Sequence, residues 1–294
     1  MVDQASNYYV TLSKKELIFL CSLIGAESII GIDDPFLIYT QEQIDSEFAD
    51  IKKVLEERNY LKTSDSGDII LDENILAIVN TCIEAQAYIL IDKIAEDKSD
   101  KIVFYATFFA VIMLTATEND DEIFISFKRT TEDVRNDIYS LIPLIEPGND
   151  EGESSSMDID IRITESLFDK IIAAEDDSQI KEAVKALEDS GVDKDYAEIV
   201  ANTLSKPSVK TSFLSLENGG DNELDGKGFA IFEGDQNILL MIPSDEEEYI
   251  NVCSYKKDKI SSVVESILNS ILRTYFFQDD DVINFMDQLF LHQD

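Results

Sequence analysis

The chain has 294 residues, of which 61 are acidic and 24 basic, so its formal net charge is −37. A field of that sign repels nucleic acids and anionic membranes, and binding to either is not expected. Hydrophobic residues make up 44% of the chain. A chain of this length and composition can bury about three-quarters of the surface that its unfolded form exposes, which excludes global disorder.

The first residues, "MVDQASNYYV", lack a basic stretch followed by an apolar one, so no signal peptide is predicted. The longest apolar run, 102–116, is too short to span a membrane, and its β-branched and aromatic residues favour buried strands. Three cysteines, Cys21, Cys82 and Cys253, lie in apolar segments without metal-ligand spacing. They are interpreted as buried side chains in a reducing compartment, and the chain as a soluble cytoplasmic protein.

Three helices are predicted first. A capping box formed by Ser13 and Glu16 opens one of them, and a second box formed by Thr40 and Gln43 opens the next. The third helix is predicted over 73–97, where the sequence is apolar on most faces, which indicates a central position.

Strands are predicted next, over 101–117 and 122–129, joined by an acidic turn. In the second of these segments Ile123 and Ile125 are expected to point one way and Phe124 the other, because side chains alternate along a strand. A helical segment then closes this part of the chain.

Residues 146–157 are rich in Pro, Gly, Ser and acidic residues, which predicts a linker between a first half, 1–145, and a second half, 158–273. After the linker the same order restarts: a strand, capped helices, strands, an acidic turn and a closing helix. The sequence "SFKR" at 126–129 matches "SYKK" at 254–257 without a gap. This order predicts an α+β fold with a pseudo-two-fold internal duplication around a central antiparallel sheet flanked by helical bundles.

Residues 274–294 have no counterpart in the first half and predict an amphipathic helical tail, either packed on the chain's own core or serving as an interaction arm. The tail holds His292, the only histidine, so a histidine-based catalytic dyad is not expected. No phosphate-binding or zinc-binding motif is present. The acidic residues Asp221, Glu223 and Asp225 alternate as in a calcium loop but lack the bidentate Glu, so no metal or cofactor is predicted.

The paired acidic turns are interpreted as solvated hairpin tips rather than catalytic carboxylates, and the chain as a binding protein rather than an enzyme. The candidate contact residues are the two acidic tips, one acidic loop and two strand residues expected to face outward. They are Glu118, Asp120, Asp121, Phe124, Asp221, Glu246, Glu247, Glu248 and Val252.

Three segments carry a resemblance to a known family. They are "VTLSKKELIFLCSLIG" followed by "DPF", then "IKKVLEERNYL", and finally "FAIFEGDQNILLMIPSDEEEYINVCSYKKDKISSVVESIL". The pattern resembles the EspG-type cytosolic chaperones of type VII secretion and their relatives in Firmicutes. This resemblance implies a central antiparallel sheet with helical bundles beside it. It also implies helical-hairpin partners, namely small WXG-motif proteins or toxins with an LXG-type targeting domain, kept soluble for export.

The net charge of −37 supports a second hypothesis, since an acidic surface can steer a cationic partner. On that reading the chain is an immunity protein that neutralises a basic secreted toxin.

Overall fold

A computed structural model describes residues 9–26, 28–95, 98–108, 110–116, 121–128, 130–142, 158–220, 223–235 and 237–275. The predicted linker and nearly all of the predicted tail lie outside these ranges. None of the helices within them combines the length and apolar character needed to cross a bilayer.

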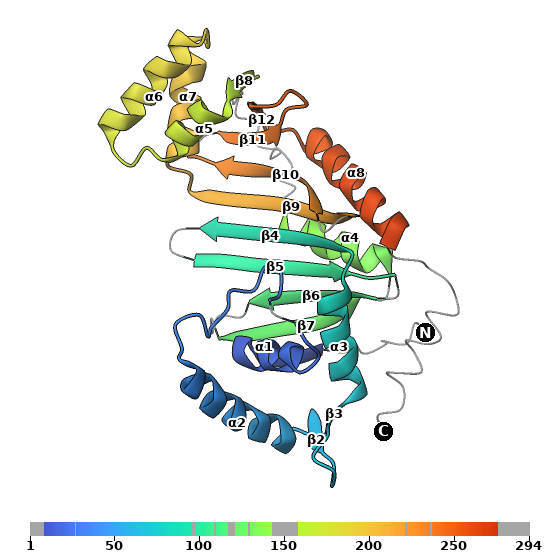
Figure 1. The fold of residues 1–294 in the computed structure, drawn as a ribbon. Coiled ribbons are helices and arrows are strands. Elements are labelled where there is room, and N and C mark those ends of the chain that lie inside the picture. Colours follow the sequence, from blue (N-terminus) through green and yellow to red (C-terminus); the bar gives the residue numbers. More distant parts are fainter. Residues whose placement is uncertain are drawn as a thin grey trace.

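A ten-stranded antiparallel sheet runs through the molecule in the order β1-β7-β6-β5-β4-β9-β10-β11-β12-β8 (Figure 1). Its strands in chain order are β1 (Tyr9–Ser13), β4 (Ala87–Ala95), β5 (Lys98–Ala106), β6 (Val111–Ala116), β7 (Glu122–Lys128), β8 (Asp160–Thr164), β9 (Val209–Gly220), β10 (Glu223–Glu233), β11 (Ile238–Pro243) and β12 (Tyr249–Ser254). A separate hairpin joins β2 (Leu61–Thr63) to β3 (Ile69–Leu71).

The strand order is mirrored about the centre of the sheet. Read inward from one edge it is β1-β7-β6-β5-β4, and from the other edge β8-β12-β11-β10-β9. The central pair is therefore β4 and β9, which come from different halves of the chain and pair over the whole length of β4, from Ala87↔Glu217 to Ala95↔Val209.

The helices are α1 (Lys14–Ser22), α2 (Gln41–Glu57), α3 (Glu73–Glu84), α4 (Thr131–Leu141), α5 (Glu165–Ile172), α6 (Asp177–Asp189), α7 (Lys194–Ser205) and α8 (Lys257–Tyr275). Both predicted capping boxes are present: Ser13 accepts from the Glu16 N–H, and Thr40 accepts from the Gln43 N–H. These side chains satisfy backbone donors that the first helical turn leaves without partners.

The third predicted helix, over 73–97, is wrong in its second part. Helix α3 ends at Glu84, Ala85 has extended backbone angles, and the chain continues as β4.

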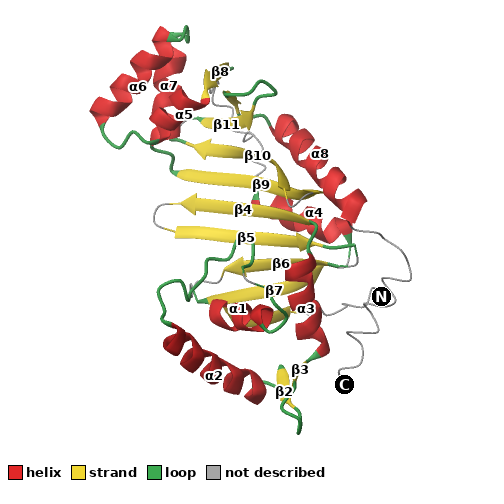
Figure 2. Cartoon of the chain, viewed as in Figure 1, coloured by secondary structure: helices red, strands yellow, loops and turns green. Residues whose placement is uncertain are grey.

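The two sides of the sheet have separate cores. On one side, which we call the α4–α8 face, Ile91, Phe104 and Phe213 pack with the buried faces of α4 and α8. On the other side, one core gathers under α1 and α3 in the first half and another under α5 and α7 in the second. Figure 2 shows α1 and α3 as red ribbons at one end of the sheet and α5 and α7 at the other.

The predicted alternation in β7 is confirmed, because Ile123 and Ile125 are buried in the core under α1 while Phe124 lies on the opposite side. All three cysteines are buried, as predicted.

Candidate functional site

Among the residues that the structure describes, helices cover the centre of the sheet on one side only. On the α4–α8 face, Phe213 of β9 is 1% exposed, whereas its neighbour Leu214, on the opposite side, is 39% exposed. On that opposite side α3 contacts β5 and β6, and α7 contacts β10 and β11, so these helices stand to either side of β4 and β9 (Figure 1). We call the area between them the open face. Its apolar part consists of Leu90, Leu214, Leu216, Leu224, Gly226 and Gly228, and the polar pair Asp92 and Ser212 separates this part from Ile94.

The apolar part of the open face lies where a solvated strand surface is normally polar. Leu224 is 46% exposed and Leu214 39%, while Leu90 and Leu216 are half-buried. An antiparallel sheet with one face in water usually alternates apolar and polar residues. Contiguous exposed apolar side chains, in contrast, mark surfaces that bind other molecules.

Two glycines give this surface its shape. Gly226 and Gly228 of β10 pair with Leu216 and Leu214 of β9. A Cβ atom on Gly226 would lie 3.3 Å from Leu216 Cδ2, and one on Gly228 would lie 3.5 Å from Leu214 Cδ1, so the leucines lean over the glycine backbone. The result is a low, apolar strip to which a partner's backbone can come close.

The described residues hold no group of three or more His, Cys, Asp or Glu side chains that is suited to a metal ion. Cys21 and Cys82 lie close together in the first-half core, and there a hydrogen bond with Cys21 and burial raise the pKa of the Cys82 thiol well above its usual value. A buried thiol with a raised pKa is a poor nucleophile. The apolar part of the open face itself presents leucine side chains and glycine backbone.

The acidic tips predicted as contact sites are not brought together. Asp121 at the β6–β7 turn is exposed, as are Glu246, Glu247 and Glu248 at the β11–β12 turn. Strands β6, β5, β4, β9, β10 and β11 lie between β7 and β12, which run in opposite directions. The two tips therefore lie at opposite ends of the strands. At roughly 4.8 Å per strand they are about 30 Å apart or more.

Each tip instead anchors the start of a helix. The Lys14 N–H donates to the Asp121 carbonyl, and the Glu165 N–H donates to the Glu248 carbonyl, both at 2.9 Å. Glu246 is paired with Arg162, Nη1–Oε1 2.7 Å.

The two strand residues expected to face outward differ in outcome. Phe124 is half-buried and stacks on Tyr9, with ring centroids 5.1 Å apart. Val252 does not face outward, because it is fully buried in the core under α5 and α7 and has no surface to offer a partner. Glu118, Asp120 and Asp221 lie outside the described residues. The open-face leucines were not predicted, although the apolar residues on both sides of β9 were a signal for them.

The fold and the site together define an α+β protein with a mirrored antiparallel sheet and an apolar, helix-flanked open face. No protein-family model matches the sequence, and no curated protein matches it.

Among solved structures, the chain is similar to the Mycobacterium tuberculosis type VII secretion system chaperone EspG5, solved in complex with the PE25–PPE41 dimer. The match covers 90% of this chain and 97% of that chain, with a TM-score of 0.60 and 8% sequence identity. The EspG resemblance inferred from the sequence is therefore confirmed at the level of the fold.

Proposed function

We propose that this chain is a non-enzymatic cytosolic chaperone or adaptor that holds helical substrates of a type VII secretion system before export. The observation that carries the proposal is the open face, an apolar surface at the centre of a fold that EspG5 shares. The EspG5 structure contains a bound PE25–PPE41 dimer, which supports a protein partner for this fold.

The partner we propose is a helix or helical hairpin with an apolar face. An amphipathic helix laid between α3 and α7 can place its apolar side chains on Leu90, Leu214 and Leu216. Full burial of one leucine contributes about 1.5–3 kcal/mol, and these side chains are already partly covered, so several anchors must act together. The partners that we propose are small WXG-motif proteins or LXG-type toxin targeting domains.

The acidic residues predicted from the sequence remain candidates for secondary contacts at the rims: Glu118, Asp120, Asp121, Asp221, Glu246, Glu247 and Glu248. We also propose that the mirrored strand order arose by internal duplication, with halves 1–145 and 158–273, a linker at 146–157 and an added tail at 274–294. The mirrored order and the paired helix anchors at Lys14 and Glu165 support this proposal.

Leu214→Glu tests the proposed site. The substitution places a charge in the middle of the open face without removing a buried side chain, so the chain should still fold. Its capture of the small helical proteins encoded beside its gene should fall at least tenfold, because an unpaired charge is costly to bury. Co-purification after co-expression, followed by calorimetry, measures the loss.

Ile70→Glu is the matched control, because Ile70 is also exposed (57%) but lies on the β2–β3 hairpin. Equal capture by wild type, Leu214→Glu and Ile70→Glu would contradict the proposed site.

The second candidate, an acidic immunity protein, is favoured by the net charge of −37. Binding to a cationic toxin domain should weaken steeply as salt is raised, because ions screen surface charges. Binding on the open face should instead persist at high salt, since it depends on apolar burial.

A further inference from the structure

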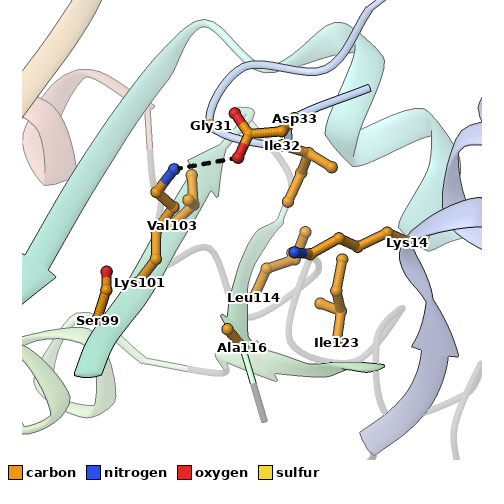
Figure 3. Close-up of a pocket in the computed structure, with 10 residues that line it drawn as sticks. All are labelled: Lys14, Gly31, Ile32, Asp33, Ser99, Lys101, Val103, Leu114, Ala116 and Ile123. Atoms are coloured by element: carbon orange, nitrogen blue, oxygen red, sulfur yellow. Dashed lines mark ion pairs between the residues drawn. The ribbon is translucent and has the colours of Figure 1, made fainter. Parts of the chain in front are cut away.

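A hollow of about 200 Å³ opens on the same side of the sheet as the open face, over strands β5, β6 and β7 of the first half (Figure 3). Its floor is formed by Val103 of β5, Leu114 and Ala116 of β6, and Ile123 of β7. Pockets for drug-sized ligands measure about 300–1,000 Å³, so this one is suited to a single side chain rather than a whole cofactor.

The rim of the hollow carries charged side chains of both signs. Lys14, at the start of α1, and Lys101 of β5 approach from two sides, and Asp33 lies between them on the loop after α1 (Figure 3). The Lys101 Nζ lies 3.8 Å from the Asp33 Oδ2, and Asp33 is largely exposed. For Lys14, the described part of the chain contains no ion-pair partner. A second carboxylate, that of Asp92, lies next to Lys101 across the β4–β5 pair and accepts a hydrogen bond from the lining Ser99 hydroxyl at 2.8 Å. Lys14 is therefore the cation of the rim that is left to pair with a ligand.

The walls of the hollow are held in place before any ligand arrives. The Tyr105 hydroxyl donates to the Ile30 carbonyl, which fixes the loop against β5. Gly31 lies so close to β5 that a Cβ atom there would be 2.8 Å from Val103 Cγ2. The Lys14 N–H donates to the Asp121 carbonyl at 2.9 Å, which fixes the start of α1. A pocket with fixed walls loses little conformational entropy when it is filled.

We propose that this hollow is a binding pocket for a peptide segment of a partner protein that presents one apolar side chain next to an acidic residue. The apolar side chain fills the space above Leu114 and Ile123, and the carboxylate accepts a hydrogen bond from the ammonium group of Lys14. Acidic side chains more than about 8 Å from the hollow do not prevent this, because at physiological ionic strength their charges are largely screened. The nearer Asp92 carboxylate is already engaged by the Ser99 hydroxyl. The proposal does not rest on the chaperone function, since it concerns the binding of a short peptide by itself.

Methyl-labelled protein titrated with the blocked dipeptide N-acetyl-Phe-Glu-amide tests the pocket. We expect saturable NMR shifts at the methyl groups of Val103, Leu114 and Ile123. The neutral isostere N-acetyl-Phe-Gln-amide should bind about two- to fivefold more weakly, as expected for loss of a surface ion pair. N-acetyl-Ala-Glu-amide, which lacks the large apolar group, should leave the floor methyl groups unshifted.

Two test variants, each with a matched control variant, keep the test independent of folding. Ala116→Leu fills the hollow and should abolish the shifts, whereas Ala95→Leu, at the end of β4 and outside the pocket, should bind as wild type does. Lys14→Gln should make the Glu and Gln dipeptides bind equally; Lys62→Gln on the β2–β3 hairpin should not. The proposal is overturned by equal binding of the Glu and Gln dipeptides to wild type, by unchanged binding to Ala116→Leu, or by shifts confined to other methyl groups.

Discussion

Glu265 of α8 joins the two halves of the chain on the α4–α8 face. Its carboxylate accepts hydrogen bonds from Arg135 Nε at 3.0 Å and from the Tyr139 hydroxyl at 2.8 Å, both on α4. Burial by itself would raise the pKa of Glu265, but the hydrogen bonds from Tyr139 and Arg135 outweigh it and the pKa is lowered. Burial and the bond to Glu265 raise the pKa of Tyr139 to about 12.

Glu265→Gln should lower the free energy of unfolding at pH 7 by about 1 kcal/mol, a modest value because the carboxylate is one-third exposed. Since the folded pKa of Glu265 lies below its unfolded value of about 4.5, its stabilisation is present above that pH and is lost as the pH falls through the folded pKa. The difference in the free energy of unfolding between variant and wild type should therefore shrink as the pH falls below the unfolded value and through the lower folded pKa.

Urea titrations at several pH values measure this dependence. Glu132→Gln is the control, because Glu132 also contacts Arg135 but is 66% exposed. An equal effect of both variants on the free energy of unfolding at every pH would contradict the assignment of this pH dependence to Glu265.

Single residues also show what the sequence pattern could not predict. The alternation in β7 correctly separated the two sides of that strand, but period-two patterning does not state which side of a strand a helix covers. Val252 was therefore expected on the surface and is buried, because α5 packs on β12.

Among the elements, β10 has two glycines in equivalent pairings but different surroundings. A Cβ atom on Gly228 would lie 2.5 Å from the Phe213 backbone carbonyl, whereas on Gly226 the nearest atom is the movable Leu216 Cδ2 at 3.3 Å. We expect Gly228→Ala to destabilise the fold by about 1–3 kcal/mol, because the β9–β10 backbones must separate.

Gly226→Ala should leave the free energy of unfolding nearly unchanged. The alanine reduces the conformational entropy of the unfolded chain, which stabilises the fold, and this gain offsets the cost of a small shift of the Leu216 side chain. Thermal and urea unfolding of the two variants compare them directly. The same loss of stability in both would show that the close backbone approach at Gly228 is unimportant.

Helix α3 and strand β4 show how element boundaries depend on tertiary contacts. Residues 86–95 are apolar on both sides and no glycine or proline separates them from α3, so a continuous helix and a helix followed by a strand are equally consistent with the pattern. Strand pairing with β5 and β9, on both sides, decides for the strand. The capped helices α1 and α2 had a local signal at their first residues, and their starts were predicted correctly.

For the whole molecule, the core of the α4–α8 face crosses the boundary between the halves. It contains Ile89 and Phe104 from the first half with Phe229 and Leu268 from the second. The pairing of β4 with β9 adds a continuous ladder between them. We therefore expect one cooperative unfolding transition.

Leu20→Ala in the first half and Leu187→Ala in the second should each shift the entire transition, by about 2–5 kcal/mol, because both side chains are fully buried. Far-ultraviolet circular dichroism and tyrosine fluorescence during urea unfolding should coincide for wild type and both variants. A variant that unfolds one half and leaves the other intact would contradict this expectation.

The sequence by itself determined the fold class, the capped helices, the recurrence of the element order and the resemblance to EspG-type proteins, because capping and period-two alternation are local properties of neighbouring residues. Only the tertiary structure decided that β4 is a strand, that the acidic tips lie apart, and that Leu214 and Leu216 form an open face. These features depend on which strand pairs with which and on where helices leave the sheet uncovered, and such contacts join residues more than a hundred positions apart.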